Sequence, residues 1–258
     1  MNCDIEIDGS IGGGSVLRVA VPLALGLNKS IKITNIRAAR KRPGLRNQHL
    51  LGLEALATIT GSELIGGFVG SQAVQFNPTN IGKSKSKIQI NIDTAASVSL
   101  ILQALSNYSF VSGNDIDLDF IGGGSHTNWS PNLEYVKYVT DPVFQKFGQK
   151  INVSLERVGF YPKVGARGNI KIESHLVNTP VFIEYTQISN IFITLIASSN
   201  LKKANVLERQ LEILSNKLSS NYDITTKLRY EETPSSGTGV TVIVNYLSNV
   251  PKGISKLG

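Results

Sequence analysis

The sequence predicts an α+β protein in which one β-α-β-α-β-β unit is used twice and is followed by a smaller β-α-β-β unit. Three observations predict this class. Apolar residues alternate over short stretches, as in strands, and recur at helical spacing in longer stretches between them. Turns rich in glycine punctuate both passages. The order of predicted elements in residues 4–77 recurs in residues 86–174, which indicates an internal repeat.

Each element of the repeat is predicted from its own pattern. Ile31 and Ile33 alternate with polar residues as in a strand, whereas Leu50, Leu53 and Leu56 follow helical spacing. The first passage predicts strands at 4–8, 31–37, 62–70 and 72–77 and helices at 15–28 and 46–60. The second predicts strands at 86–93, 115–120, 151–158 and 168–174 and helices at 95–109 and 131–148. Because two helices cover one face of each predicted sheet, two such units can share a core.

The third passage contains one helix rather than two. It predicts strands at 188–198, 222–231 and 238–247 and a helix at 204–218, which we interpret as a small inserted domain. Residues 181–185 could open a third repeat, which the remaining chain is too short to finish. The predicted organisation is a main domain at 1–185 with repeats at about 1–82 and 83–178, an inserted domain at 186–248, and a truncated return toward the main domain at 249–258.

Composition limits the classes of function. The net charge of +7 and the isoelectric point near 9.4 favour a polyanionic partner such as nucleic acid. Cys3 is the only cysteine, which excludes an internal disulfide and a cysteine zinc site and suits a reducing compartment. We expect a cytoplasmic protein without a membrane segment, because there is neither a signal-peptide pattern nor a run of 18 apolar residues.

A basic turn lies between the predicted strand at 31–37 and the predicted helix at 46–60. Its cationic residues are Arg37, Arg40, Lys41, Arg42 and Arg46. The dipeptide Pro43-Gly44 is a strong turn signal. Guanidinium groups pair with phosphate oxygens two at a time, and a helix N-terminus offers N–H groups to the same anion. The turn is therefore either an anion site or a solvated charged loop, and spacing alone does not separate these interpretations.

Several motifs occur together, in one order, across nearly the whole chain. They are Asp8-Gly9-Ser10, Gly12-Gly13-Gly14, Leu17-Arg18, Asn35-Ile36-Arg37-Ala38-Ala39-Arg40, Pro43-Gly44-Leu45-Arg46-Asn47-Gln48-His49-Leu50, Gly70-Ser71-Gln72, Leu102-Gln103, Gly122-Gly123, Trp129-Ser130-Pro131 and Gly159-Phe160-Tyr161-Pro162. On these motifs the chain resembles the RNA 3′-terminal phosphate cyclases, which are relatives in fold of enolpyruvyl transferases. The repeated unit and the small inserted domain agree with that resemblance.

The resemblance implies an ATP-dependent reaction at RNA 3′-phosphate ends. A histidine takes AMP, the AMP moves to the RNA phosphate, and the neighbouring 2′-hydroxyl closes a 2′,3′-cyclic phosphate. A divalent metal, Mg or Mn, would assist on the triphosphate. The resemblance places phosphate and nucleotide contacts at Arg18, Arg37, Arg40, Gln48, Gln103 and Pro131. From their own positions in turns, we expect Arg42, Arg46 and His126 to contact RNA.

The chain departs from the family pattern in ways that bear on catalysis. Ile11 and Ser15 stand where the family's glycine loop carries a glutamate and a glutamine. The glycine-rich turn after Tyr161-Pro162 is also degraded. The family's nucleophilic histidine is expected beyond the last residue, so no catalytic residue is assigned. For His49, we favour a hydrogen bond at the start of a helix over contact with a bound phosphate. We also expect Asp8 to cap a turn and Trp129 to pack rather than stack on a base.

Three hypotheses follow. The first is an active RNA 3′-terminal phosphate cyclase. The second is a non-catalytic RNA-binding relative that acts in ribosomal RNA processing. The third, on fold analogy alone, is a phosphometabolite enzyme of the enolpyruvyl-transferase type, which the basic charge disfavours. Whether an incomplete third repeat leaves an apolar face that drives a homodimer stays open at the level of sequence.

Overall fold

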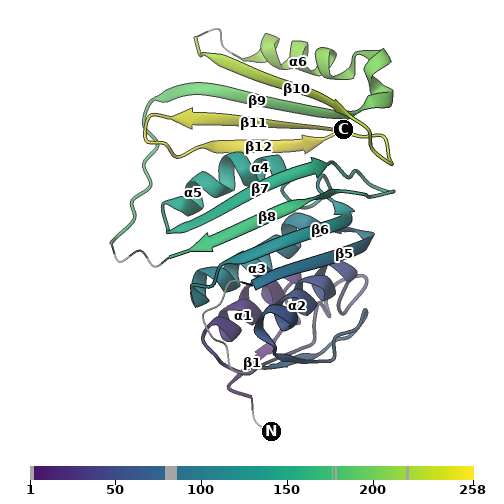
Figure 1. Cartoon of the computed structure of the whole chain (residues 1–258), viewed down its shortest axis with the longest axis vertical. Helices are drawn as coiled ribbons and strands as arrows, with labels where there is room; N and C mark the ends of the chain where they lie inside the picture. Colours follow the sequence, from purple (N-terminus) through teal and green to yellow (C-terminus); the bar gives the residue numbers. More distant parts are fainter. Residues whose placement is uncertain (1–2, 79–85, 176, 178, 219–220) are drawn as a thin grey trace.

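The computed structural model describes residues 3–78, 86–175, 177, 179–218 and 221–258. Within them the chain is α+β and forms three four-stranded mixed sheets. Figure 1 shows the sheets following one another along the long axis of the molecule. Helices α1 to α3 lie between the first and second sheets, and α6 covers the outer side of the third.

The first repeat has the predicted order of elements. They are β1 (Ile5–Asp8), α1 (Gly14–Gly26), β2 (Ile31–Thr34), α2 (Asn47–Thr60), β3 (Glu63–Ile65) and β4 (Val74–Asn77). The sheet order is β1-β2-β4-β3, in which β1 and β2 are parallel and the other neighbours are antiparallel. In the parallel pair Asp8 lies opposite Thr34, so both strands end at the same edge of the sheet.

The second repeat has the same topology. Its elements are β5 (Ser86–Ser97), α3 (Val98–Ser112), β6 (Ile116–Gly124), α4 (Leu133–Tyr135), the π-helical segment η1 (Val136–Thr140), α5 (Asp141–Gln145), β7 (Gln149–Arg157) and β8 (Arg167–Ser174). The order β5-β6-β8-β7 repeats the pattern of the first sheet, with β5 and β6 parallel. The predicted internal repeat is thereby confirmed. The helix predicted at 131–148 is three consecutive helical segments, because a π-helical turn separates α4 from α5.

The two repeats share one hydrophobic core. It contains Leu17 and Leu25 from α1, Leu56 from α2, and Leu105 and Tyr108 from α3, each at most 1 % exposed. Burying one such aliphatic side chain contributes about 1.5–3 kcal/mol relative to leaving it exposed. The helices therefore hold the two sheets together through a continuous apolar layer, to which the apolar residues at helical spacing contribute.

The third sheet is wound differently. Its elements are β9 (Ile188–Ser198), the 3-10 helix η2 (Ser199–Ala204), α6 (Val206–Lys217), β10 (Ile224–Glu231), β11 (Thr238–Tyr246) and β12 (Lys252–Leu257). The order is β10-β9-β11-β12, so the predicted β-α-β-β unit is present with a fourth strand at its edge. Residues 181–185 form no strand, so they do not open a third repeat. The predicted division into domains stays a prediction, and its boundaries at 82–83 and 178 lie outside the described residues.

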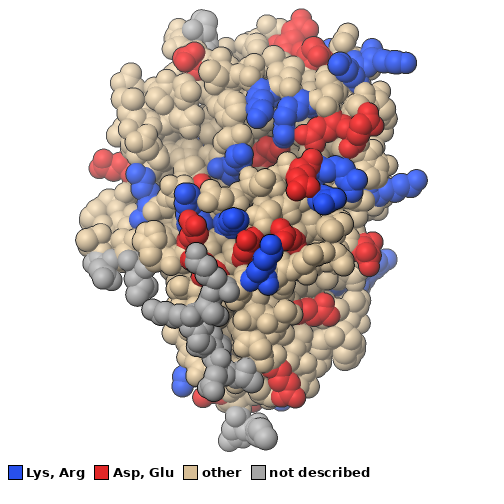
Figure 2. Space-filling model, in the orientation of Figure 1, with Lys and Arg blue, Asp and Glu red and all other residues tan. Residues whose placement is uncertain are grey.

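Polar and apolar contacts join the third sheet to the second repeat. Phe160 and Val158 pack with Ile196 of β9. The Asn132 amide donates to the Thr241 hydroxyl of β11 at 3.0 Å. On the face drawn in Figure 2, Lys and Arg side chains alternate with Asp and Glu over the middle and upper parts of the molecule, so this face carries no continuous basic patch. No helix in the described part of the chain is long and apolar enough to cross a membrane.

Candidate functional site

The carboxyl ends of β1 and β2 bring two distant turns together. Asp8 accepts hydrogen bonds from the Ser10 N–H at 2.9 Å and the Asn35 amide at 3.2 Å, so it caps these turns as expected. These hydrogen bonds also hold the pKa of Asp8 below its ordinary value. The Gly9 N–H donates to the Thr34 carbonyl at 2.8 Å. The glycine loop before α1 and the basic turn before α2 therefore form one surface.

The basic turn has an internal frame. Arg37 has a positive φ of 55°, and its Nη1 donates to the carbonyls of Arg42 at 3.1 Å and Gly44 at 2.9 Å. Burial, followed by the charges of Arg46 and Arg40, lowers the pKa of Arg37. The cations thus lie close enough to repel one another. A bound anion would relieve that repulsion, which favours the anion-site interpretation over an ordinary solvated loop.

Two of the predicted arginines reach the glycine loop at the start of α1. A Cβ added at Gly14 would lie 2.8 Å from Arg18 Nη1 and 2.2 Å from His49 Nε2. A Cβ added at Gly13 would lie 3.4 Å from Arg40 Nη2. Glycine is required at position 14 because any side chain would collide with the imidazole. We call Arg18, Arg37, Arg40, Arg46 and His49, with the Gly13–Gly14 backbone, the arginine cluster.

His49 is a neutral imidazole inside this cluster. Its Nδ1 accepts the Arg46 N–H at 3.1 Å, so the predicted hydrogen bond at a helix start is confirmed. Burial, then the charges of Arg37, Arg18 and Arg46, lower its pKa to about 4. Because Nδ1 accepts, the proton of the neutral ring lies on Nε2, which faces the glycine loop. His49 therefore presents an N–H donor toward a bound anion.

A second group of predicted residues lines a hollow beside the arginine cluster. Arg18 is half-buried, which lowers its pKa, and its Nε donates to Gln103 Oε1 at 2.8 Å. Arg18, Gln103, Pro131 and Trp129 line a hollow of about 380 Å³. This volume falls in the range of small-ligand sites. Arg18 thus connects the arginine cluster to a space that could hold a nucleoside.

Two further predicted residues, Gln48 and Arg42, lie beside the arginine cluster, and Arg46 belongs to it. Gln48 lies half-buried in the first turn of α2. Arg42 is exposed in the basic turn, where its carbonyl accepts from Arg37. Arg46 is half-buried at the N-cap of α2. All three lie on the elements that carry the arginine cluster.

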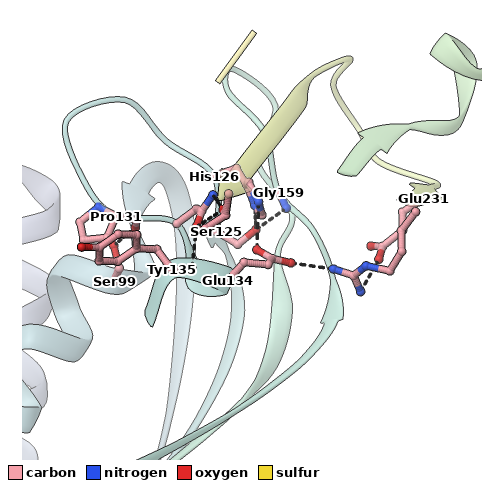
Figure 3. Close-up of polar contacts among 11 residues, drawn as sticks. Ser99, Ser125, His126, Pro131, Glu134, Tyr135, Gly159 and Glu231 are labelled. Carbon is pink, nitrogen blue, oxygen red and sulfur yellow. Dashed lines mark hydrogen bonds and ion pairs between the residues drawn. The ribbon is translucent and has the colours of Figure 1, made fainter. Parts of the chain in front are cut away.

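The expectation that His126 contacts RNA is wrong. Its side chain is 1 % exposed, so it offers no surface to RNA. Its Nε2 lies 3.0 Å from Glu134 Oε2, and its Nδ1 lies 3.0 Å from the Ser125 hydroxyl (Figure 3). Arg229 of β10 donates to the other oxygen of Glu134 at 2.6 Å. The glycine turn before His126 suggested a ligand contact, but the third sheet covers this position.

Trp129 also differs from the expectation. We predicted packing, and its side chain is 99 % exposed at a backbone φ of 69°. The sequence signal that could have shown this is the glycine-rich strand end before it, since loops at strand ends carry exposed functional side chains.

The described residues offer no protein cage for a metal ion. No group of three or more His, Cys, Asp or Glu side chains is gathered in the described ranges. In the glycine loop the Ile11 side chain is 94 % exposed and supplies no oxygen ligand. The described residues therefore supply no preformed ligand set of this kind for the divalent metal implied by the resemblance, although Mg²⁺ needs only one or two carboxylates beside substrate phosphates.

Comparisons with known proteins give a consistent result. The family model described as RNA 3′-terminal phosphate cyclase matches residues 10–228. A protein of that name from Thermococcus kodakarensis is 35 % identical over 243 residues, which cover 93 % of this chain and 69 % of the relative. The protein of the same name from Methanosarcina mazei is 34 % identical over 264 residues, covering 94 % and 74 %. That from Pyrococcus abyssi is 34 % identical over 247 residues, covering 93 % and 69 %.

Proposed function

Because the chain belongs to the RNA 3′-terminal phosphate cyclase family, we propose that it binds ATP and the phosphorylated 3′ end of RNA and that it converts this end to a 2′,3′-cyclic phosphate. In this reaction the AMP part of ATP is joined to the 3′-phosphate, while the bond between the α- and β-phosphates of ATP breaks and pyrophosphate leaves. The neighbouring 2′-hydroxyl then attacks phosphorus, a new O–P bond forms, and the bond to AMP breaks.

The observation that carries the proposal is the convergence of the arginine cluster on the N-terminus of α1. Arg18 and Arg40 reach the glycine loop, and Arg37 and Arg46 contribute positive charge nearby. No side chain caps the first turn of α1, so its N–H groups remain available to an anion. A phosphate in this position would offset the repulsion among the guanidinium groups and would stabilise the charge that develops on its oxygens.

The neutral His49 suits binding rather than nucleophilic attack. Its Nδ1 lone pair is occupied by the Arg46 N–H, and its Nε2 carries the proton. It can donate to a phosphate oxygen without adding a charge. The hollow beside Arg18, Gln103 and Pro131 would then receive the nucleoside attached to that phosphate.

One observation favours a second candidate, a non-catalytic RNA-binding relative. The two buried histidines are both engaged, His49 with the Arg46 N–H and His126 with Glu134. Both rings are buried, so neither offers an accessible nitrogen of the kind that covalent capture of AMP requires, and the third histidine, His175, is exposed just after β8. Binding without turnover would need only the arginine cluster.

Incubation with α-labelled ATP, a divalent metal salt and RNA bearing a 3′-phosphate separates these candidates. With ATP and metal alone, an active cyclase becomes labelled with AMP. When the 3′-phosphorylated RNA is then added, the label leaves the protein as AMP and the RNA 3′ end becomes resistant to phosphatase. RNA bearing a 3′-hydroxyl is the matched control and should leave the label on the protein. Retained binding of 3′-phosphorylated RNA with no label on the protein would contradict catalysis by this chain and support the second candidate.

A further inference from the structure

Trp129 is the only tryptophan of the chain, and nothing within the described residues covers it. Its side chain is 99 % exposed, more than any other large apolar side chain in the described ranges. Its φ of 69° lies in the left-handed region that residues other than glycine rarely adopt. An aromatic ring held in solvent on a strained backbone indicates a binding surface more often than a packing element.

The loop that presents Trp129 is held by a chain of hydroxyl groups. The Ser130 hydroxyl lies 2.8 Å from that of Thr127 and 2.9 Å from that of Ser97. The Ser99 hydroxyl donates to the Pro131 carbonyl at 2.7 Å, and Figure 3 shows these two residues facing each other. The residues on both sides of Trp129 are therefore fixed to β5 and α3, and the exposure of the ring is a property of an ordered loop.

Trp129 belongs to the lining of two hollows. It lines the hollow of about 380 Å³ that is also lined by Arg18 and Gln103. It also lines a second hollow of about 370 Å³ whose lining includes Asn128 and Lys256 of β12. Each hollow therefore has a cation in its lining, Arg18 in one and Lys256 in the other. An extended anionic chain whose planar groups can stack would meet both cations and the aromatic face.

We propose that Trp129 is a stacking platform for a base of single-stranded RNA, namely the nucleotide that precedes the phosphorylated 3′ end, with Lys256 beside the chain as it leaves the site. The position of this base rests on the proposed function, because it takes the terminal phosphate to lie in the arginine cluster. Every base has an aromatic face, so stacking on Trp129 would add affinity without selecting a sequence.

The geometry separates this proposal from stacking on the ATP base. One nucleotide would fill a single hollow, whereas a strand that passes Trp129 would use both. The other occupant of this surface that the titration tests is a second copy of this chain.

The fluorescence of Trp129 reports on the site directly, since no other tryptophan contributes. The full chain is titrated with a short 3′-phosphorylated RNA, with the same RNA lacking the base at the penultimate position, and with ATP alone. We expect quenching by the intact RNA and little quenching by the abasic RNA or ATP. Quenching by ATP but not by RNA, or a concentration-dependent blue shift without RNA, would overturn the proposal in favour of the nucleotide or of self-association.

Variants provide the second measurement, the affinity for end-labelled RNA. Trp129→Ala should weaken binding of the intact RNA about tenfold, as loss of one stacked base predicts, and leave binding of the abasic RNA unchanged. Trp129→Phe should keep most of the affinity. Phe182→Ala is the matched control, because Phe182 is an exposed aromatic residue, 84 % exposed, outside both hollows. If Trp129→Ala bound the intact RNA as tightly as the wild-type chain does, the stacking platform would be refuted.

The same titration distinguishes failure of this inference from failure of the proposed function. If RNA with a 3′-hydroxyl binds as tightly as RNA with a 3′-phosphate and still quenches Trp129, the stacking platform stands and recognition of the terminal phosphate does not. If the phosphate is discriminated while the abasic RNA binds as well as the intact RNA, the reverse holds.

Discussion

Arg37 and Arg40 lie three positions apart and have different tasks. Arg37 donates to two carbonyls of its own turn and thereby fixes the turn. Arg40 is exposed, and its Nη2 lies near Gly13 at the start of α1. The first residue therefore shapes the site, and the second is placed to meet a ligand. This difference can be tested with single substitutions.

Arg40→Ala should weaken binding of 3′-phosphorylated RNA by about ten- to a hundredfold, because it removes one charge-assisted hydrogen bond to phosphate. Binding of 3′-hydroxyl RNA should weaken much less. Lys41→Ala is the matched control, since it removes the same charge from the adjacent exposed position. Measured dissociation constants that change equally for both RNAs would show that Arg40 does not face the terminal phosphate.

His49 links the site to the pH dependence of stability. Its pKa is about 4 in the folded chain, against 6.5 for the unperturbed group. Between these values the unfolded chain binds a proton that the folded chain does not, so stability is complete above pH 6.5 and falls as the pH approaches 4. The loss reaches about 3 kcal/mol at most.

Denaturant unfolding from pH 7 to pH 4 measures this loss. His49→Asn keeps an acceptor for the Arg46 N–H, and the new side chain does not titrate. The free energy of unfolding of this variant should be lower than that of the wild type at pH 7, and it should change less between pH 7 and pH 4. Carboxylates with lowered pKa values, such as Asp8, lose their stabilising effect only at lower pH. A wild-type profile parallel to that of His49→Asn would show that His49 is not buried as a neutral ring.

At the scale of elements, the turn between β2 and α2 depends on close backbone approaches. Gly44 has a φ of 78°, and a Cβ added there would lie 2.2 Å from the Gly70 carbonyl oxygen. Gly70 has a φ of 89°, but a Cβ added there would meet nothing within 4 Å. The two glycines therefore share a backbone conformation and differ in the space around them.

Gly44→Ala should lower the free energy of unfolding by about 3 kcal/mol, since it adds a collision with a backbone atom to the strain of a left-handed residue. Gly70→Ala should cost about 1 kcal/mol, from strain alone. Denaturant unfolding of both variants tests the pair. Similar losses would mean that strain alone, and not the contact between the two turns, fixes the conformation at position 44.

At the scale of the whole molecule, a buried ion pair joins the third sheet to the second repeat. Glu134 is 7 % exposed and lies between His126 and Arg229. Burial raises its pKa, but the charges of His126 and Arg229 and the hydrogen bond from His126 lower it by more, so the carboxylate stays ionised. Arg229 also contacts Glu231 at 3.1 Å. The cluster ties β10 to α4 across the junction of the two units.

Arg229→Ala should lower the free energy of unfolding by about 2 kcal/mol, because it leaves the Glu134 carboxylate with less compensation in a buried position. Since Arg229 is 30 % exposed, the cost should fall below that of a fully buried pair. Combining it with Glu134→Gln should recover part of the loss. A double-mutant cycle in thermal unfolding measures the coupling, and additive losses would mean that the pair does not join the two units.

The order of the elements, the repeat and the arginines of the arginine cluster were predictable from the sequence, whereas the place of His49 in that cluster was not. These features rest on local periodicity and on motifs such as Arg37 to Arg40, which are written in contiguous residues. The lengths of strands were less predictable. For example, β5 runs to Ser97, where helical spacing suggested that a helix had already begun.

Which candidate residues are accessible to a ligand depends on tertiary packing. His126 and Trp129 lie three residues apart after the same glycine turn, yet one is 1 % exposed and the other 99 %. The third sheet covers the first and leaves the second in solvent. Burial depends on which distant segments pack over a position, and that information is spread over contacts that no local pattern contains.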